Sequence, residues 1–209
     1  MRLFSRAPAR RAEPVPAPPL DGPVAGVRAW IAAEEASGAV VLRSLVLPHS
    51  AWRSATETAR CGLGRLPHDA PDERCECGLY AWWELDDTAV GQAADAVATA
   101  LGLHALGAVL GAVMGWGDRV VLHREGWRAG RARIVALSAP DPAACAAMLG
   151  RYLARVEPYA DWAAERASRS VWATESVVGR VAAAYSVPVV PQRGLETVAL
   201  EHGCRPDLG

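Results

Sequence analysis

The sequence contains no lysine and no asparagine, and it has one phenylalanine and only two isoleucines. All 22 basic residues are therefore arginine. Together with the abundance of alanine, this pattern is typical of a GC-rich genome, and an actinobacterial source would fit it. Because lysine is missing, arginine stands at every basic position. A run of arginines in this chain is therefore weak evidence for nucleic-acid or phosphate binding.

The chain also lacks a strong net charge, an even set of cysteines and a long hydrophobic run. A formal net charge of −1 argues against nucleic-acid binding by bulk electrostatics. Five cysteines among 209 residues, without a recognisable export signal, do not suggest a disulfide framework. No 18-residue segment resembles a membrane span. We therefore expect a soluble cytoplasmic protein without membrane contact.

Three regions differ in composition. Residues 1–24 are rich in proline and arginine, which favours a disordered tail. The hydrophobic content of 51% is high enough for a sizeable core in the rest of the chain. We expect a β-rich core domain over residues 25–140, and a helical C-terminal region over residues 141–209 that packs on this core.

Local patterns predict an α+β fold, with an antiparallel, partly barrel-like sheet flanked by helices. The predicted helices span residues 24–37, 51–60, 89–101, 142–156, 161–185 and 195–202. The predicted strands span residues 39–47, 75–83, 106–116, 119–123 and 127–137, with turns at 117–118 and 125–126. The first helix has an alternative, because the whole segment up to Leu47 could be β-rich.

Glycine recurs every fourth residue at Gly107, Gly111 and Gly115. On a helix, this spacing would form a stripe for close packing. Each interior glycine, however, costs a helix about 1 kcal/mol relative to alanine. A strand is therefore the preferred interpretation.

Four residues that can bind a soft metal lie within 17 positions, namely Cys61, His68, Cys75 and Cys77. Thiolate and imidazole are zinc ligands, and the glycines and prolines between them let the loop fold back on the strand. The spacing matches no standard zinc-finger pattern. The competing interpretation makes the cysteines buried apolar residues of a strand face.

Other residues suggest weaker alternatives. Cys77 could be a nucleophile with His68 or His123 as its base, although no nucleophile motif surrounds it. His123, Trp127 and Arg128 are candidate binding residues, because arginine beside an aromatic ring can stack on bases or bind phosphate.

Arg128 has a structural interpretation as well. Strand alternation predicts that it is buried and held by several carbonyls or by a carboxylate, for which Glu84, Asp86 and Asp118 are candidates. The rival interpretation makes it an exposed ligand-binding arginine.

Two phrases resemble the recurring motifs of a family of uncharacterised bacterial proteins, mainly actinobacterial. They are CECGLYA at residues 75–81 and GAVMGWGDRVVLHREGWRA at residues 111–129. The family's motifs are CxCG(I/L)YA and GxVxxWGxVxxHxxG(Y/W)RA. The resemblance covers about residues 40–138 and carries no assigned activity. It implies that the cysteine segment and the glycine-rich strands form one folded unit.

These observations favour a non-catalytic binding or accessory module, for which a structural zinc site at the four residues is one option and buried core thiols are the other. The runner-up is a cysteine- or zinc-dependent enzyme, and the third option is a weak nucleic-acid-binding module. The expected partner is a protein or a small molecule whose identity the sequence does not reveal, and nucleic acid is not the expected partner.

Overall fold

The computed structural model describes residues 20, 22–46, 50–61, 68–100, 104–156 and 171–208. Most of the predicted tail, residues 1–19 and 21, lies outside these ranges. Val24, the last residue of that predicted tail, is fully buried and begins the first strand. The folded part of the chain therefore includes residues that were assigned to the tail.

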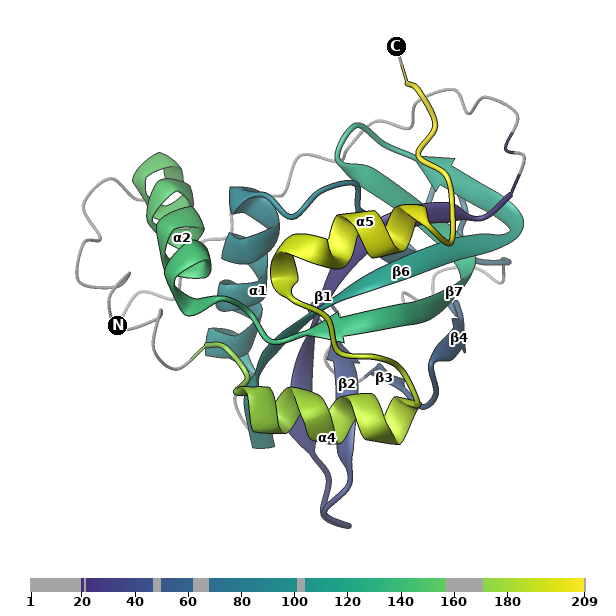
Figure 1. The fold of residues 1–209 in the computed structure, drawn as a ribbon. Helices are drawn as coiled ribbons and strands as arrows, with labels where there is room; N and C mark the ends of the chain where they lie inside the picture. The colour runs from purple at the N-terminus through teal and green to yellow at the C-terminus, as the bar shows by residue number, and fades with distance from the viewer. Residues whose placement is uncertain are drawn as a thin grey trace.

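The fold is α+β, as predicted, and the described strands form one seven-stranded antiparallel sheet (Figure 1). The strands are β1 (Val24–Glu34), β2 (Val40–Ser44), β3 (Ala51–Trp52), β4 (Thr56–Thr58), β5 (Leu79–Trp82), β6 (His104–Leu122) and β7 (Gly126–Ser138). The helices are α1 (Asp87–Thr99), α2 (Pro142–Val156), α4 (Glu175–Tyr185) and α5 (Leu195–Leu200), with a short 3-10 turn, η1 (Gln192–Gly194), before α5.

Four of the strands close into a ring. β6 pairs with both β1 and β7, and β5 also pairs with both β1 and β7. β2 and β3 continue the sheet outward from β1, and β4 pairs with β7. The partly barrel-like sheet is thus confirmed, and the ring brings β5 and β7 together beside the cysteine-rich segment.

The predicted helix over residues 24–37 is wrong, because this segment forms strand β1. Even-numbered residues such as Trp30 belong to the hydrophobic cluster inside the sheet. Odd-numbered residues such as Val27 belong to a second cluster, under α1, α2 and α5. Since both faces are covered, both carry apolar residues, and the polar–apolar alternation that would have identified a strand is absent.

Two other predictions need correction. Residues 51–60 form β3 and β4 instead of a helix, because their backbones pair with β2 and β7. The predicted strand over residues 75–83 is shorter, since only Leu79–Trp82 is extended and paired. Cys75 and Cys77 therefore lie in the loop that precedes β5.

The strand interpretation of the glycine repeat is confirmed, with a packing reason. A Cβ atom on Gly111 would lie 2.8 Å from the Trp30 ring, and one on Gly115 would lie 2.2 Å from the Trp127 ring. The glycines thus leave space for two buried indole rings. The predicted turn at residues 117–118 is a register shift within one continuous strand, and β6 continues to Leu122.

The helices cover the sheet. α1 packs on α2, β1 and β6, and α5 packs across β1, β6 and β7 (Figure 1). α2 begins as predicted, with the Asp141 carboxylate accepting hydrogen bonds from the backbone N–H groups of Ala143 and Ala144. The predicted helix over residues 161–185 falls partly outside the described residues, and its described part, α4, begins only at Glu175.

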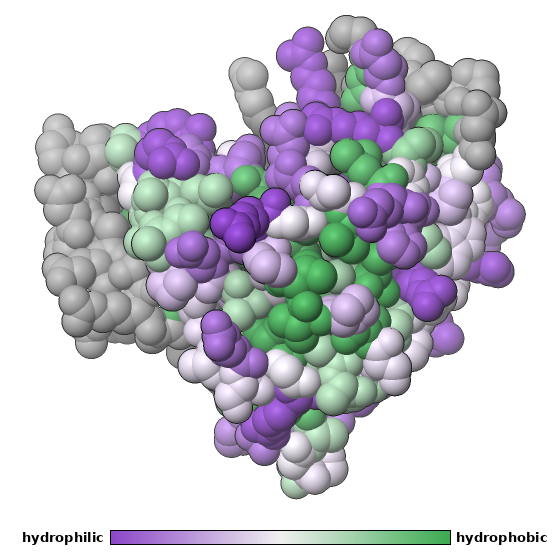
Figure 2. Space-filling model, viewed as in Figure 1, coloured by the Kyte–Doolittle hydropathy of each residue, from purple (hydrophilic) through white to green (hydrophobic). Residues whose placement is uncertain are grey.

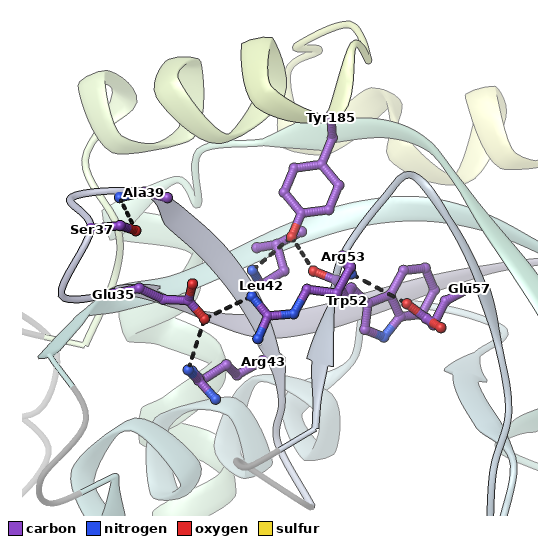
Figure 3. Close-up of polar contacts among 9 residues, drawn as sticks. All are labelled: Glu35, Ser37, Ala39, Leu42, Arg43, Trp52, Arg53, Glu57 and Tyr185. Carbon is purple, nitrogen blue, oxygen red and sulfur yellow. Dashed lines mark hydrogen bonds and ion pairs between the residues drawn. The ribbon is translucent and has the colours of Figure 1, made fainter.

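Tyr185, at the end of α4, attaches this helix to the sheet (Figure 3). Its hydroxyl accepts a hydrogen bond from the backbone N–H of Leu42 at 3.0 Å and donates one to the carbonyl of Trp52 at 2.5 Å. Leu42 lies in β2 and Trp52 lies in β3. One side chain therefore connects α4 to two short strands.

Hydrophobic side chains gather on the surface between α4 and α5 (Figure 2). Val189, between these helices, and Leu200, in α5, are exposed large hydrophobic residues. Such a concentration on one face is typical of contact surfaces. Among the described residues, no helix combines the length and the hydrophobicity that a membrane crossing requires.

Candidate metal centre

The four predicted ligands come from two sides of one loop. Cys61 follows β4, and Cys75 and Cys77 precede β5. His68 begins the described part of the segment that leads to these cysteines, and residues 62–67 lie outside the described ranges. The sheet brings the two sides together, because β4 and β5 both pair with β7.

The structure brings all four predicted ligands together. One donor atom from each of Cys61, His68, Cys75 and Cys77 lies within 4.8 Å of the other three. The Sγ atoms of Cys61 and Cys75 are 3.8 Å apart, and Nε2 of His68 is 3.2 Å from Sγ of Cys77. This Cys3His group could hold a metal ion.

These distances suit a tetrahedral zinc centre. Two sulfur atoms, each about 2.3 Å from a tetrahedral zinc ion, are about 3.8 Å apart. The separation of Cys61 and Cys75 therefore matches zinc coordination. The four donor atoms lie within 4.8 Å of one another, so the widest separation would have to shorten by up to about 1 Å on zinc binding.

Cys77 is the most enclosed of the four ligands. Burial raises the pKa of its thiol to about 11, a backbone hydrogen bond from Asp72 opposes this rise, and the thiols of Cys75 and Cys61 add to it. A metal ion binds the thiolate, so binding at neutral pH would displace a proton from this sulfur.

Arg128 lies in β7 and binds the backbone of the cysteine loop. Its predicted burial is confirmed, since only 3% of the residue is exposed. Its Nη1 donates to the carbonyl oxygens of Cys75, of Cys77 at 2.9 Å and of Asp72 at 3.3 Å. The sequence predicts either several carbonyls or a carboxylate as partners, and the structure shows carbonyls. Glu84, Asp86 and Asp118, the suggested carboxylates, are not among its partners.

Tyr80 makes a second connection to this loop, which sequence reasoning missed. Its hydroxyl donates to the carbonyl of Glu76, between the two cysteines. The Tyr80 ring also lies 5.6 Å from the Arg128 guanidinium carbon. The motif shows that a tyrosine follows Cys77 by three residues. Its hydrogen bond to the Glu76 carbonyl could not be predicted, because it depends on the path of the loop.

The two other candidate binding residues are buried. Trp127 lies in the core, and its indole N–H donates to the carbonyl of Ala25 at 2.8 Å. Nε2 of His123 accepts a hydrogen bond from Nε of Arg128 at 3.0 Å, which places His123 beside Arg128. His68, in contact with Cys77, is better placed than His123 to act as a base for that thiol.

Comparison with family models, with curated proteins and with solved structures finds no match. Kinship with the actinobacterial family therefore stays a prediction based on the two motifs.

Proposed function

We propose that this protein is a non-catalytic binding or accessory module in which a structural zinc ion fixes the cysteine-rich loop. The observation that carries the proposal is the convergence of one donor atom each from Cys61, His68, Cys75 and Cys77 to within 4.8 Å. Cys3His is a common ligand set of structural zinc sites.

The number of ligands favours a structural role over a catalytic one. Four protein ligands fill a tetrahedral zinc ion, whereas a catalytic zinc keeps one position for water or substrate. The hollow beside the β1–β2 turn, which Arg43 and His104 help to line, includes none of the four ligands. The apolar surface between α4 and α5 supports the idea of a module that contacts a partner.

Metal analysis of the purified full-length chain tests the proposal. We expect about one zinc per chain, and loss of this zinc in Cys75→Ser, because a hydroxyl is a poor replacement for a thiolate ligand. Cys204→Ser is the matched control, since Cys204 is exposed and outside the cluster. A wild-type chain that stays metal-free after reconstitution with zinc would favour the interpretation of the cysteines as buried core thiols.

A thiol-dependent enzyme is the second candidate, because Nε2 of His68 lies 3.2 Å from Sγ of Cys77. Such an enzyme needs a reactive thiolate at neutral pH, while burial raises the pKa of Cys77. Alkylation with iodoacetamide at pH 7, followed by peptide mapping, separates the candidates. Rapid and selective labelling of Cys77 in the protein as purified would favour the enzyme, and protection that is lost on chelation would favour the zinc module.

A further inference from the structure

Arg128 is a buried cation without a carboxylate partner among the described residues. Its guanidinium group donates to three backbone carbonyls and to the imidazole of His123, and it also contacts the Tyr80 side chain. The Asp72 carboxylate, although close in the chain to these carbonyls, accepts from the backbone N–H of Arg74 at 2.8 Å and lies 3.8 Å from Arg119. Among the described residues, the hydrogen-bond partners of Arg128 are thus neutral dipoles and include no carboxylate.

A buried cation is costly unless an anion or several strong dipoles stabilise it. The proposed zinc centre would supply the missing negative charge. A zinc ion of charge +2 with three thiolates and a neutral imidazole has a net charge of 2 − 3 = −1. Arg128 donates to the carbonyls of Cys75 and Cys77, which carry two of these thiolates.

We infer that Arg128 is the positioning residue and the countercharge of an anionic zinc–thiolate centre. This inference rests on the proposed zinc site. Its guanidinium group fixes the backbone on both sides of Glu76, so that the sulfur atoms of Cys75 and Cys77 are presented to the metal together.

The contact geometry requires arginine. Nη1 serves the loop carbonyls, while Nε donates to His123, so two separate nitrogens of one rigid group are used. The guanidinium carbon also lies 5.6 Å from the Tyr80 ring. A lysine ammonium would keep the charge but could not reach His123 and the loop carbonyls from one fixed plane.

The test compares Arg128→Met and Arg128→Lys with the wild-type chain and with Arg133→Met. Arg133 is the matched control, because it lies on β7 and is exposed. Zinc affinity is measured by competition with a chromophoric chelator. The cobalt-substituted protein then reports the sulfur-to-cobalt charge-transfer bands, and melting is recorded with zinc and with excess EDTA.

We expect Arg128→Met to weaken zinc binding by about 10- to 100-fold, which is the range for residues that support metal ligands. The zinc affinity of Arg128→Lys should lie between those of Arg128→Met and the wild type, because lysine keeps the charge but lacks the planar set of N–H donors. The increase in Tm caused by zinc should shrink in both variants, whereas Tm in EDTA should change less. Arg133→Met should behave like the wild type.

Zinc affinity of Arg128→Met within about threefold of the wild type would overturn the inference, since supporting residues act more strongly than this. An Arg128→Met chain that fails to fold even in EDTA, or a Tm loss that is equal with and without zinc, would also overturn it by giving Arg128 a purely structural role. A wild-type chain that binds no zinc would contradict the proposed zinc site itself. A wild-type chain that binds zinc, with unchanged affinity in Arg128→Met, would contradict only the role of Arg128.

Discussion

Gly78 sits where a side chain has no room, immediately after the last cysteine of the loop. Its φ of +124° is a conformation that residues with a Cβ rarely adopt. A Cβ there would lie 3.0 Å from Cβ of Pro71 and 3.2 Å from Cβ of Arg128. The glycine of the CxCG motif therefore allows the loop to pack closely against β7. This close packing places Cys77 in the Cys3His group.

Replacing Gly78 with alanine should destabilise the protein by about 1–3 kcal/mol, because it adds backbone strain in a crowded position. It should also lower zinc affinity, since the strain acts next to Cys77. Chemical denaturation and the chelator competition measure the two effects. Gly179→Ala is the control, because Gly179 lies in α4 and a Cβ atom on it would meet nothing within 4 Å.

The control substitution, Gly179→Ala, should change the stability in the opposite direction. An added methyl group at an exposed helical glycine should raise stability by up to about 1 kcal/mol. A neutral result for Gly78→Ala would show that the loop adapts easily, and the close contacts of Gly78 would then not limit the residue at this position.

Arg28, on β1, is a second buried arginine. Its guanidinium carbon lies 5.6 Å and 5.3 Å from the rings of Trp30 and Trp52, and Nη1 donates to the Tyr80 carbonyl. Burial lowers the pKa of Arg28 to about 10, so it remains charged at neutral pH. Stacking on two indole rings offsets part of its desolvation.

At the scale of elements, one buried hydroxyl links α4 to the sheet, in addition to the apolar side chains that the helix packs into the core. Tyr185→Phe would leave the backbone N–H of Leu42 without its acceptor and the carbonyl of Trp52 without its donor (Figure 3). Because an unpaired buried polar group costs about 1–3 kcal/mol, we expect a loss of stability in this range. Urea denaturation measures the loss.

Arg53→Ala is the control for this substitution. Arg53 forms an ion pair with Glu35 at 2.8 Å in the same region, but 66% of its side chain is exposed. Exposed ion pairs contribute about 0–1 kcal/mol, so this variant should stay close to the wild type. Equal losses in the two variants would contradict the idea that the Tyr185 hydroxyl joins α4 to β2 and β3.

At the scale of the whole molecule, the two ends of the described chain meet at the sheet. The backbone N–H of Ala25 donates to the carbonyl of Cys204, and the backbone N–H of Cys204 donates to the carbonyl of Pro23, both at 2.8 Å. Val24, between these contacts, is fully buried. The start of β1 is thus paired with the segment that follows α5.

Deleting residues 1–24 should therefore lower Tm by more than deleting residues 1–19. Burying a valine contributes about 1.5–3 kcal/mol. For a protein of this size, 1 kcal/mol corresponds to about 2–4 °C, so the difference between the two truncations should be about 3 °C or more. Thermal melts of both chains under the same zinc concentration measure it, and identical Tm values would show that residues 20–24 contribute nothing to the fold.

Several features follow from the sequence alone, because short-range chemistry specifies them. Asp141 and Pro142 start α2, and the cost of interior glycines disfavours a helix over residues 107–115. Thiols and imidazoles are side chains that can bind a metal, so the candidate ligands are recognisable from their residue types. Each of these inferences needs only neighbouring residues.

The remaining features depend on contacts between distant parts of the chain. β1 is a strand because β2, β5 and β6 pair with it and both faces are covered, which overrides the helical preference of its alanines and glutamate. Arg128 lies more than 50 residues from the carbonyls that it binds. The sequence by itself determined which residues could form a metal centre, and tertiary structure decided their geometry, because only the closed ring of strands places β7 beneath the cysteine loop.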